Sequence, residues 1–200
     1  MEDKRLIRDE EAKVVTEIIV VADRSGSMNL IVEDAVGGFN SFLADQRESP
    51  DEAYLTLVRF DHEYEVVFES VPIQEMRDIT KETIKPRGQT ALLDAIGNTI
   101  TDAMVRYVQS KNRKVIVVII TDGGENASET YSSDDIKDMV ENCKKLGWEF
   151  MFLGANIDAF AEGRKLGVAR GQTVQYEATS RGITTAYSNV SDTVSSFRSG

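Results

Sequence analysis

Apolar and polar residues follow one another along this chain in two patterns, short apolar runs and longer amphipathic stretches. The apolar runs at 14–22 and 115–120 are rich in β-branched residues and indicate parallel strands buried on both faces. Further strands are predicted at 54–60, 64–71, 148–153 and 173–176, and the polar turn 61–63 makes the first two an antiparallel hairpin. Apolar residues at helical spacing predict helices over 30–47, 92–107, 133–146, 156–165 and 183–197, with a short helix around 74–77.

Strands that alternate with amphipathic helices are typical of α/β proteins. We therefore expect a doubly wound, mostly parallel six-stranded sheet with one antiparallel edge strand and helices on both faces. Residues 14–200 are expected to form a single domain, preceded by a flexible, charged N-terminal lead-in at 1–13.

The composition narrows the classes of function that this domain can have. A chain of 200 residues with 41% hydrophobic residues is large enough to bury a core, and its net charge of −11 disfavours binding to nucleic acid. The sequence contains no apolar run long enough to cross a membrane and no signal-peptide pattern. Cys143 is the only cysteine, which excludes an internal disulfide and favours a reducing compartment. We expect a cytoplasmic protein without a nucleic-acid or membrane partner; its oligomeric state is not indicated.

Oxygen-bearing side chains follow the two predicted central strands. Asp23, Ser25 and Ser27 come directly after the first strand, Asp122 ends the strand at 115–120, and Thr90 precedes the second long helix. Ligands bind to doubly wound sheets beyond the carboxyl ends of neighbouring strands, so these residues meet if the two strands are adjacent. Hard oxygen donors suit a magnesium-type cation, although the pattern after the first strand would alone fit an ordinary loop equally well.

In these residues the sequence resembles the von Willebrand factor type A domain, the fold shared with integrin I domains. The resemblance covers about residues 14–197 and is strongest in Asp23-x-Ser25-x-Ser27, Thr90 and Asp122, the three pieces of a metal-ion-dependent adhesion site (MIDAS). It implies that the hydroxyls of Ser25 and Ser27, joined by that of Thr90 in the ligand-engaged state, bind Mg²⁺ (or Mn²⁺ or Ca²⁺) directly. Asp23 and Asp122 would act through bound waters and hydrogen bonds.

The function that this resemblance implies is cation-dependent capture of an Asp or Glu side chain on a partner protein. The chain is most similar to intracellular members from bacteria and phages, which leaves an alternative open. In this alternative the protein is a structural or regulatory subunit of an intracellular complex, for example with an ATPase, and the ion is mainly structural.

An enzymatic function is not expected. Phosphotransferases with an aspartyl nucleophile need a second acid two residues further on, where this chain has Ser25, and a lysine that the equivalent loops lack. His62 is the only histidine, and it falls in a predicted turn. Cys143 lies on the apolar face of its helix, so a nucleophile paired with histidine is excluded.

The residues around the predicted site carry expectations of their own. Arg24 is expected to point outward, where it would attract an acidic partner, and Glu125 to be a solvated loop acid. Asp94 is expected to be an acid in the first turn of a helix and not a ligand. Gln89 stands where a glycine often precedes the threonine in the family, so the sequence leaves the geometry of that loop open.

Overall fold

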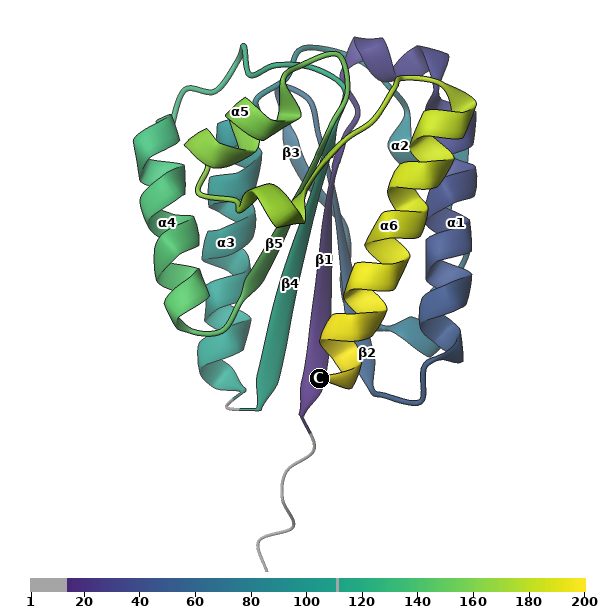
Figure 1. Cartoon of the computed structure of the whole chain (residues 1–200), viewed down its shortest axis with the longest axis vertical. Coiled ribbons are helices and arrows are strands. Elements are labelled where there is room, and N and C mark those ends of the chain that lie inside the picture. The colour runs from purple at the N-terminus through teal and green to yellow at the C-terminus, as the bar shows by residue number, and fades with distance from the viewer. Residues whose placement is uncertain (1–13, 111) are drawn as a thin grey trace, which may run out of the picture.

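A single mixed sheet runs through the centre of the protein, with helices on both faces (Figure 1). The computed structural model describes residues 14–110 and 112–200, so the predicted lead-in at 1–13 lies outside the described residues. The strands are β1 (Val15–Asp23), β2 (Ala53–Phe60), β3 (Tyr64–Pro72), β4 (Arg113–Thr121), β5 (Glu149–Gly154) and β6 (Thr173–Gln175). The helices are α1 (Val32–Glu48), α2 (Lys81–Ile84), α3 (Leu92–Gln109), α4 (Ser133–Lys145), α5 (Ala159–Lys165) and α6 (Ser180–Ser199).

The strand order β3-β2-β1-β4-β5-β6 confirms the predicted fold class. Five strands run parallel, and β3 pairs antiparallel with β2 at one edge of the sheet. The chain moves outward from β1 in one direction and from β4 in the other, so the strand order reverses between β1 and β4. A crevice for ligands is expected beyond the carboxyl ends of the strands at this point.

Two helical segments differ from the sequence prediction. The helix expected over 30–47 begins two residues later, at Val32 of α1, because the chain before it forms a 3-10 turn, Gly26–Leu30, in which the N–H of Ile31 donates to the carbonyl of Met28 (3.1 Å). The short helix expected around 74–77 lies instead at Ile73–Glu75, and a separate turn of helix, α2, follows it. A third 3-10 turn, Arg170–Gln172, precedes β6.

Alternate residues of the central strands enter two separate cores. Ile18 and Val20 of β1 face α1 and α6, while Ile19 and Val21 face α3 and α4. Both faces of the strand are therefore apolar, which explains why its sequence is a continuous hydrophobic run. Within the described helices, none is both long and apolar enough to span a bilayer.

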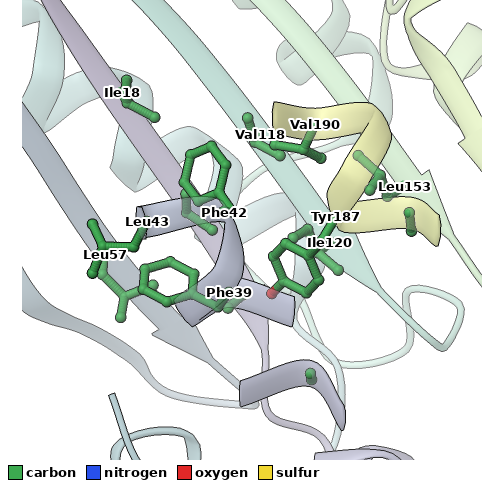
Figure 2. Packing of buried hydrophobic residues seen from close by; sticks show 14 of the residues in the cluster. Ile18, Phe39, Phe42, Leu43, Leu57, Val118, Ile120, Leu153, Tyr187 and Val190 are labelled. Atoms are coloured by element: carbon green, nitrogen blue, oxygen red, sulfur yellow. The ribbon is translucent and has the colours of Figure 1, made fainter. Parts of the chain in front are cut away.

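Aromatic residues of α1 and α6 fill the first core (Figure 2). Phe39 packs against Phe42 and edge-on against Tyr187, with ring centroids 6.0 and 6.4 Å apart. A Cβ atom on Gly38 would lie 2.4 Å from Cδ2 of Tyr187. Glycine is therefore required at this position for α1 and α6 to approach one another.

A buried acid lies near the start of β1, at the opposite end of the strand from the loop of Ser25 and Ser27, which we call the serine loop. Glu17 is fully buried, and its carboxylate is 2.7 Å from a guanidinium nitrogen of Arg106 and 2.6 Å from one of Arg113. Thr56 donates a further hydrogen bond to it (3.3 Å). These partners compensate for the loss of hydration that burial imposes on the charge.

The burial of Cys143 generates a prediction about its reactivity. Its thiol lies in the second core, and burial raises its pKa to about 11. We expect a thiol-specific reagent at pH 8 to label the native protein roughly a hundredfold more slowly than a free cysteine peptide. Labelling followed by absorbance, with the same chain unfolded in urea as the control, measures this difference. Equal rates in the native and unfolded chains would contradict the packing described for α4.

Candidate functional site

Two segments that are distant in sequence meet at the hydroxyl of Ser27. This hydroxyl donates a hydrogen bond to Oδ1 of Asp122 (2.6 Å) and lies 3.1 Å from the hydroxyl of Ser25. The two serines belong to the loop that follows β1, and Asp122 follows β4. The structure thus brings these three predicted site residues into direct contact, because β1 and β4 are neighbours in the sheet.

Asp23 lies beneath this cluster and is fully buried. Its Oδ1 accepts the backbone N–H of Ser25, and its Oδ2 accepts the hydroxyl of Thr121, both at 2.6 Å. Asp23 therefore connects the serine loop to the end of β4. Burial raises the pKa of its carboxyl to about 6, and the two hydrogen bonds oppose only part of that rise.

Asp122 shares this environment in a milder form. Burial raises the pKa of its carboxyl, and the hydrogen bond from Ser27 opposes the rise. Across residues 14–110 and 112–200, neither Asp23 nor Asp122 forms an ion pair with a basic side chain. Both acids therefore lie in surroundings that disfavour their charged form.

Thr90 reaches the same place from the loop before α3. Its hydroxyl lies 3.6 Å, and that of Ser27 3.9 Å, from the position that a Cβ atom would occupy on Gly123. Because Gly123 has no side chain, the hydroxyls of Ser27 and Thr90 face a common small space. Thr90 is buried and Ser27 is exposed, so this space opens to solvent on the Ser27 side.

Asn126 holds the backbone of Thr90 in place. Its side-chain oxygen accepts the N–H of Thr90 (2.9 Å), and its own N–H donates to the carbonyl of Thr90 (3.0 Å). Asn126 is not among the site residues expected from the sequence. Nothing in the sequence distinguishes it from an ordinary loop residue, because the contact joins segments 36 residues apart.

Glu125 lies in surroundings different from those expected from the sequence. It is not a solvated loop acid, because its carboxylate accepts the backbone N–H groups of Leu93, Ala127 and Ser128 at 2.7–2.9 Å. The first N–H groups of a helix have no partner within it, and Glu125 supplies one to the start of α3. The expected position of Asp94, in the first turn of α3, is confirmed.

Asp94 also has a role that the sequence did not indicate. Its carboxylate accepts the N–H groups of Glu129, Thr130 and Tyr131 at 2.9–3.0 Å. Burial by itself raises the pKa of Asp94, but these three hydrogen bonds outweigh burial and the pKa is lowered. Asp94 thus holds the loop that carries Asp122.

Arg24 corrects a second expectation, because it points inward and is only 2% exposed. Its Nε lies 3.3 Å from Oδ2 of Asp61, and its Nη1 lies 3.2 Å from Oε2 of Glu65. The physical reason is that Asp61, which follows β2 beside β1, is fully buried and needs a cation nearby. Arg24 is therefore not placed to attract a partner.

The donor set fits a hard divalent cation. Ser25, Ser27 and Thr90 contribute hydroxyl oxygens, while Asp23 and Asp122 contribute two carboxylates. The part of the chain that the structure describes contains no group of three or more His, Cys, Asp or Glu side chains that would hold a metal by themselves. An oxygen set without nitrogen or sulfur suits Mg²⁺, Mn²⁺ or Ca²⁺ better than a softer metal.

The raised pKa of Asp23 generates a prediction about the metal-free protein. Its pKa of about 6 lies above the ordinary 3.8, so the native state binds a proton that the unfolded chain releases between these values. Lowering the pH from 7 to 4 therefore stabilises the native state through this residue, by about 2 kcal/mol. Urea unfolding in EDTA at several pH values, compared with Asp23→Asn, isolates this contribution. Identical pH dependence in the two proteins would contradict it.

Comparison with known structures shows the same fold in proteins of very different origin. Proximal thread matrix protein 1 from the mussel byssus, solved with a zinc-occupied MIDAS motif, matches with a TM-score of 0.66 and 17% identity over 92% of this chain and 48% of that chain. The vWF domain of the type V pili tip protein Mfa5 from Porphyromonas gingivalis matches with a TM-score of 0.65 and 11% identity over 93% of this chain and 97% of that chain. A von Willebrand factor type A protein from Catenulispora acidiphila matches with a TM-score of 0.63 and 15% identity over 90% of this chain and 42% of that chain.

At these identities the similarity shows the fold alone. The chain spans about half the length of the mussel protein. A search of curated proteins found no match. The family model of the von Willebrand factor type A domain matches residues 17–191. The chain therefore belongs to the von Willebrand factor type A domain family, whose members are generally protein-interaction modules.

Proposed function

We propose that this protein is a protein-binding module that depends on a divalent cation, with Mg²⁺ at the site formed by Asp23, Ser25, Ser27, Thr90 and Asp122. The captured group is an Asp or Glu side chain of a partner protein. The observation that carries the proposal is the convergence of the hydroxyls of Ser27 and Thr90 on the space beside Gly123, which opens to solvent.

The buried acids support the same proposal. Glu17, Asp23 and Asp61 are all fully buried. Arginines neutralise Glu17 and Asp61, whereas Asp23 has only neutral donors, Ser25 N–H and the Thr121 hydroxyl. A buried carboxylate without a cation is costly, and a metal ion above it would supply the missing positive charge.

Each residue has a distinct part in the proposed site. The hydroxyls of Ser25, Ser27 and Thr90 would contact the ion, and Asp122 would orient Ser27 through the hydrogen bond already described. When bound, the ion would supply a positive charge that neutral hydroxyls leave largely uncompensated, and so attract a carboxylate. Because the chain carries a net charge of −11, an acidic partner would otherwise be repelled.

The proposal includes no catalytic step. The only histidine, His62, lies exposed in the turn between β2 and β3, and both oxygens of Asp23 are occupied by hydrogen bonds. We place the module in a reducing, intracellular compartment, in keeping with its single unpaired cysteine.

A second candidate function is a structural or regulatory subunit whose ion mainly stabilises the fold. The hydrogen bonds that favour it join β1 to β4 through the site, from Ser27 to Asp122 and from Thr121 to Asp23. An ion at this junction would hold the two strand ends together. The two candidates differ in whether the ion is needed for a partner or for stability.

Removal of one hydroxyl tests the cation site. Ser25→Ala is expected to weaken Mg²⁺ binding by at least about tenfold, because it removes a ligand in a site of few direct contacts. Isothermal titration calorimetry measures the affinity. Ser41→Ala, which removes an exposed hydroxyl on α1, is the matched control and should bind as the wild type does. A wild type that binds no Mg²⁺, or an unchanged Ser25→Ala, would overturn the proposed site.

Capture of a partner from a lysate of the source cell tests the interaction. The partner should be retained by the wild type in Mg²⁺ and lost in EDTA, and Ser25→Ala should not retain it in either condition. Thermal unfolding of the same samples separates the second candidate. Retention under all conditions, with a melting temperature that falls in EDTA, would favour a structural ion and contradict ion-mediated capture.

A further inference from the structure

A chain of three charged side chains lies beside the candidate site. Oδ2 of the fully buried Asp61 is 3.3 Å from Nε of Arg24 and 2.9 Å from Nε of Arg87. We call these three residues the Asp61 cluster. Arg24 belongs to the serine loop, Asp61 to the turn after β2, and Arg87 to the loop that carries Thr90. Arg87 also forms an ion pair with Glu63 in the same turn.

Backbone hydrogen bonds connect the same three segments. The N–H of Arg87 donates to the carbonyl of Arg24 (2.6 Å), and the N–H of Gly26 donates to the carbonyl of Gly88 (3.2 Å). The N–H of Ala91 donates to the carbonyl of Asp61 (2.7 Å). The residues on both sides of Thr90 are thus tied to the serine loop and to the β2–β3 turn.

Gly88 shows how closely this loop packs against the turn. Its φ is +71°, which favours glycine, and a Cβ atom there would lie 2.4 Å from Nδ1 of His62. The backbone of residues 87–91 is therefore confined between the serine loop, which it contacts at Arg87 and Gly88, and the β2–β3 turn, which it contacts at Ala91. This backbone conformation determines the direction of the Thr90 side chain.

We infer that the Asp61 cluster positions Thr90 and so sets the affinity of the site for its cation; this rests on the proposed function. Arg24 and Arg87 are positioning residues and not ligands. The ion pairs with Asp61 hold the loop of residues 87–91 against the serine loop, so that the hydroxyls of Thr90 and Ser27 face the same space before any ion arrives. The β2–β3 turn thereby contributes to a site that it does not touch.

The positive charge of Arg87 allows a positioning role to be distinguished from a direct electrostatic effect on the bound cation. A positive charge near a cation site repels the ion, so removing Arg87 would strengthen cation binding if only its charge mattered. If Arg87 positions Thr90, removing it weakens binding. The two explanations predict changes of opposite sign.

The first experiment is Mg²⁺ titration calorimetry on Arg87→Gln. We expect its affinity to fall roughly tenfold, as is usual when a residue that supports a ligand is lost, and Arg87→Lys to restore part of it. The matched control is Arg106→Gln, because Arg106 pairs with buried Glu17 as Arg87 pairs with buried Asp61, and each acid keeps a second arginine. Arg106 lies at the far end of the sheet, so its loss should lower the melting temperature without changing Mg²⁺ affinity.

A double-mutant cycle with Thr90→Val tests whether Arg87 acts through Thr90. The valine keeps the size of threonine but removes its hydroxyl. In this background Arg87→Gln should cause no further loss of Mg²⁺ affinity. An equal further loss would show that Arg87 acts independently of Thr90 and would overturn the inference.

Two other outcomes are also decisive. A wild type that binds Mg²⁺, together with an Arg87→Gln variant that binds it equally well or more tightly, would overturn the positioning role and leave the proposed function standing. A wild type that fails to bind Mg²⁺ would overturn both. Circular dichroism of each variant establishes that it is folded, so a lost affinity is not mistaken for a lost structure.

Discussion

The position of β1 in the sheet is the constraint on which the rest of the structure depends. This strand pairs with β2 on one side and β4 on the other, and apolar residues cover both of its faces. The end of the strand at Asp23 is therefore held by β2 and β4 on its two sides and by the two hydrophobic cores on its two faces. The serine loop begins at a fixed point, beside the ends of β2 and β4. The polar residues that follow β1, β2 and β4 converge there because these three strands are neighbours.

The buried acids near the two ends of this strand differ in whether an arginine neutralises them. At its start, Glu17 is neutralised by Arg106 and Arg113, and beside its end, Asp61 is neutralised by Arg24 and Arg87. Asp23 has no such partner within the described ranges of the chain. The free energy of unfolding is lower as a result, because the carboxylate of Asp23 is buried without a compensating positive charge.

Much of this arrangement could be predicted from the sequence, for identifiable reasons. The continuous apolar runs of β1 and β4 indicate strands buried on both faces, and such strands lie at the centre of a parallel sheet. Once they are neighbours, the acids at their ends must be close. Arg24 was placed wrongly because its surroundings depend on Asp61, which in sequence resembles any polar turn residue. Glu125 was expected to be solvated and Asn126 was not singled out, because Leu93 and Thr90, which they contact, lie more than 30 residues away in sequence.

The two acids Glu125 and Asp94 exchange hydrogen bonds between the same two segments. Glu125, in the loop after β4, bonds the first turn of α3, and Asp94, in that turn, bonds the same loop further along. These reciprocal hydrogen bonds fasten the start of α3 to the loop that carries Asp122 and Gly123. A loop of this length would ordinarily lose conformational entropy when a ligand orders it. Here that entropy is lost on folding, so a group that binds beside Gly123 meets a surface that is already ordered.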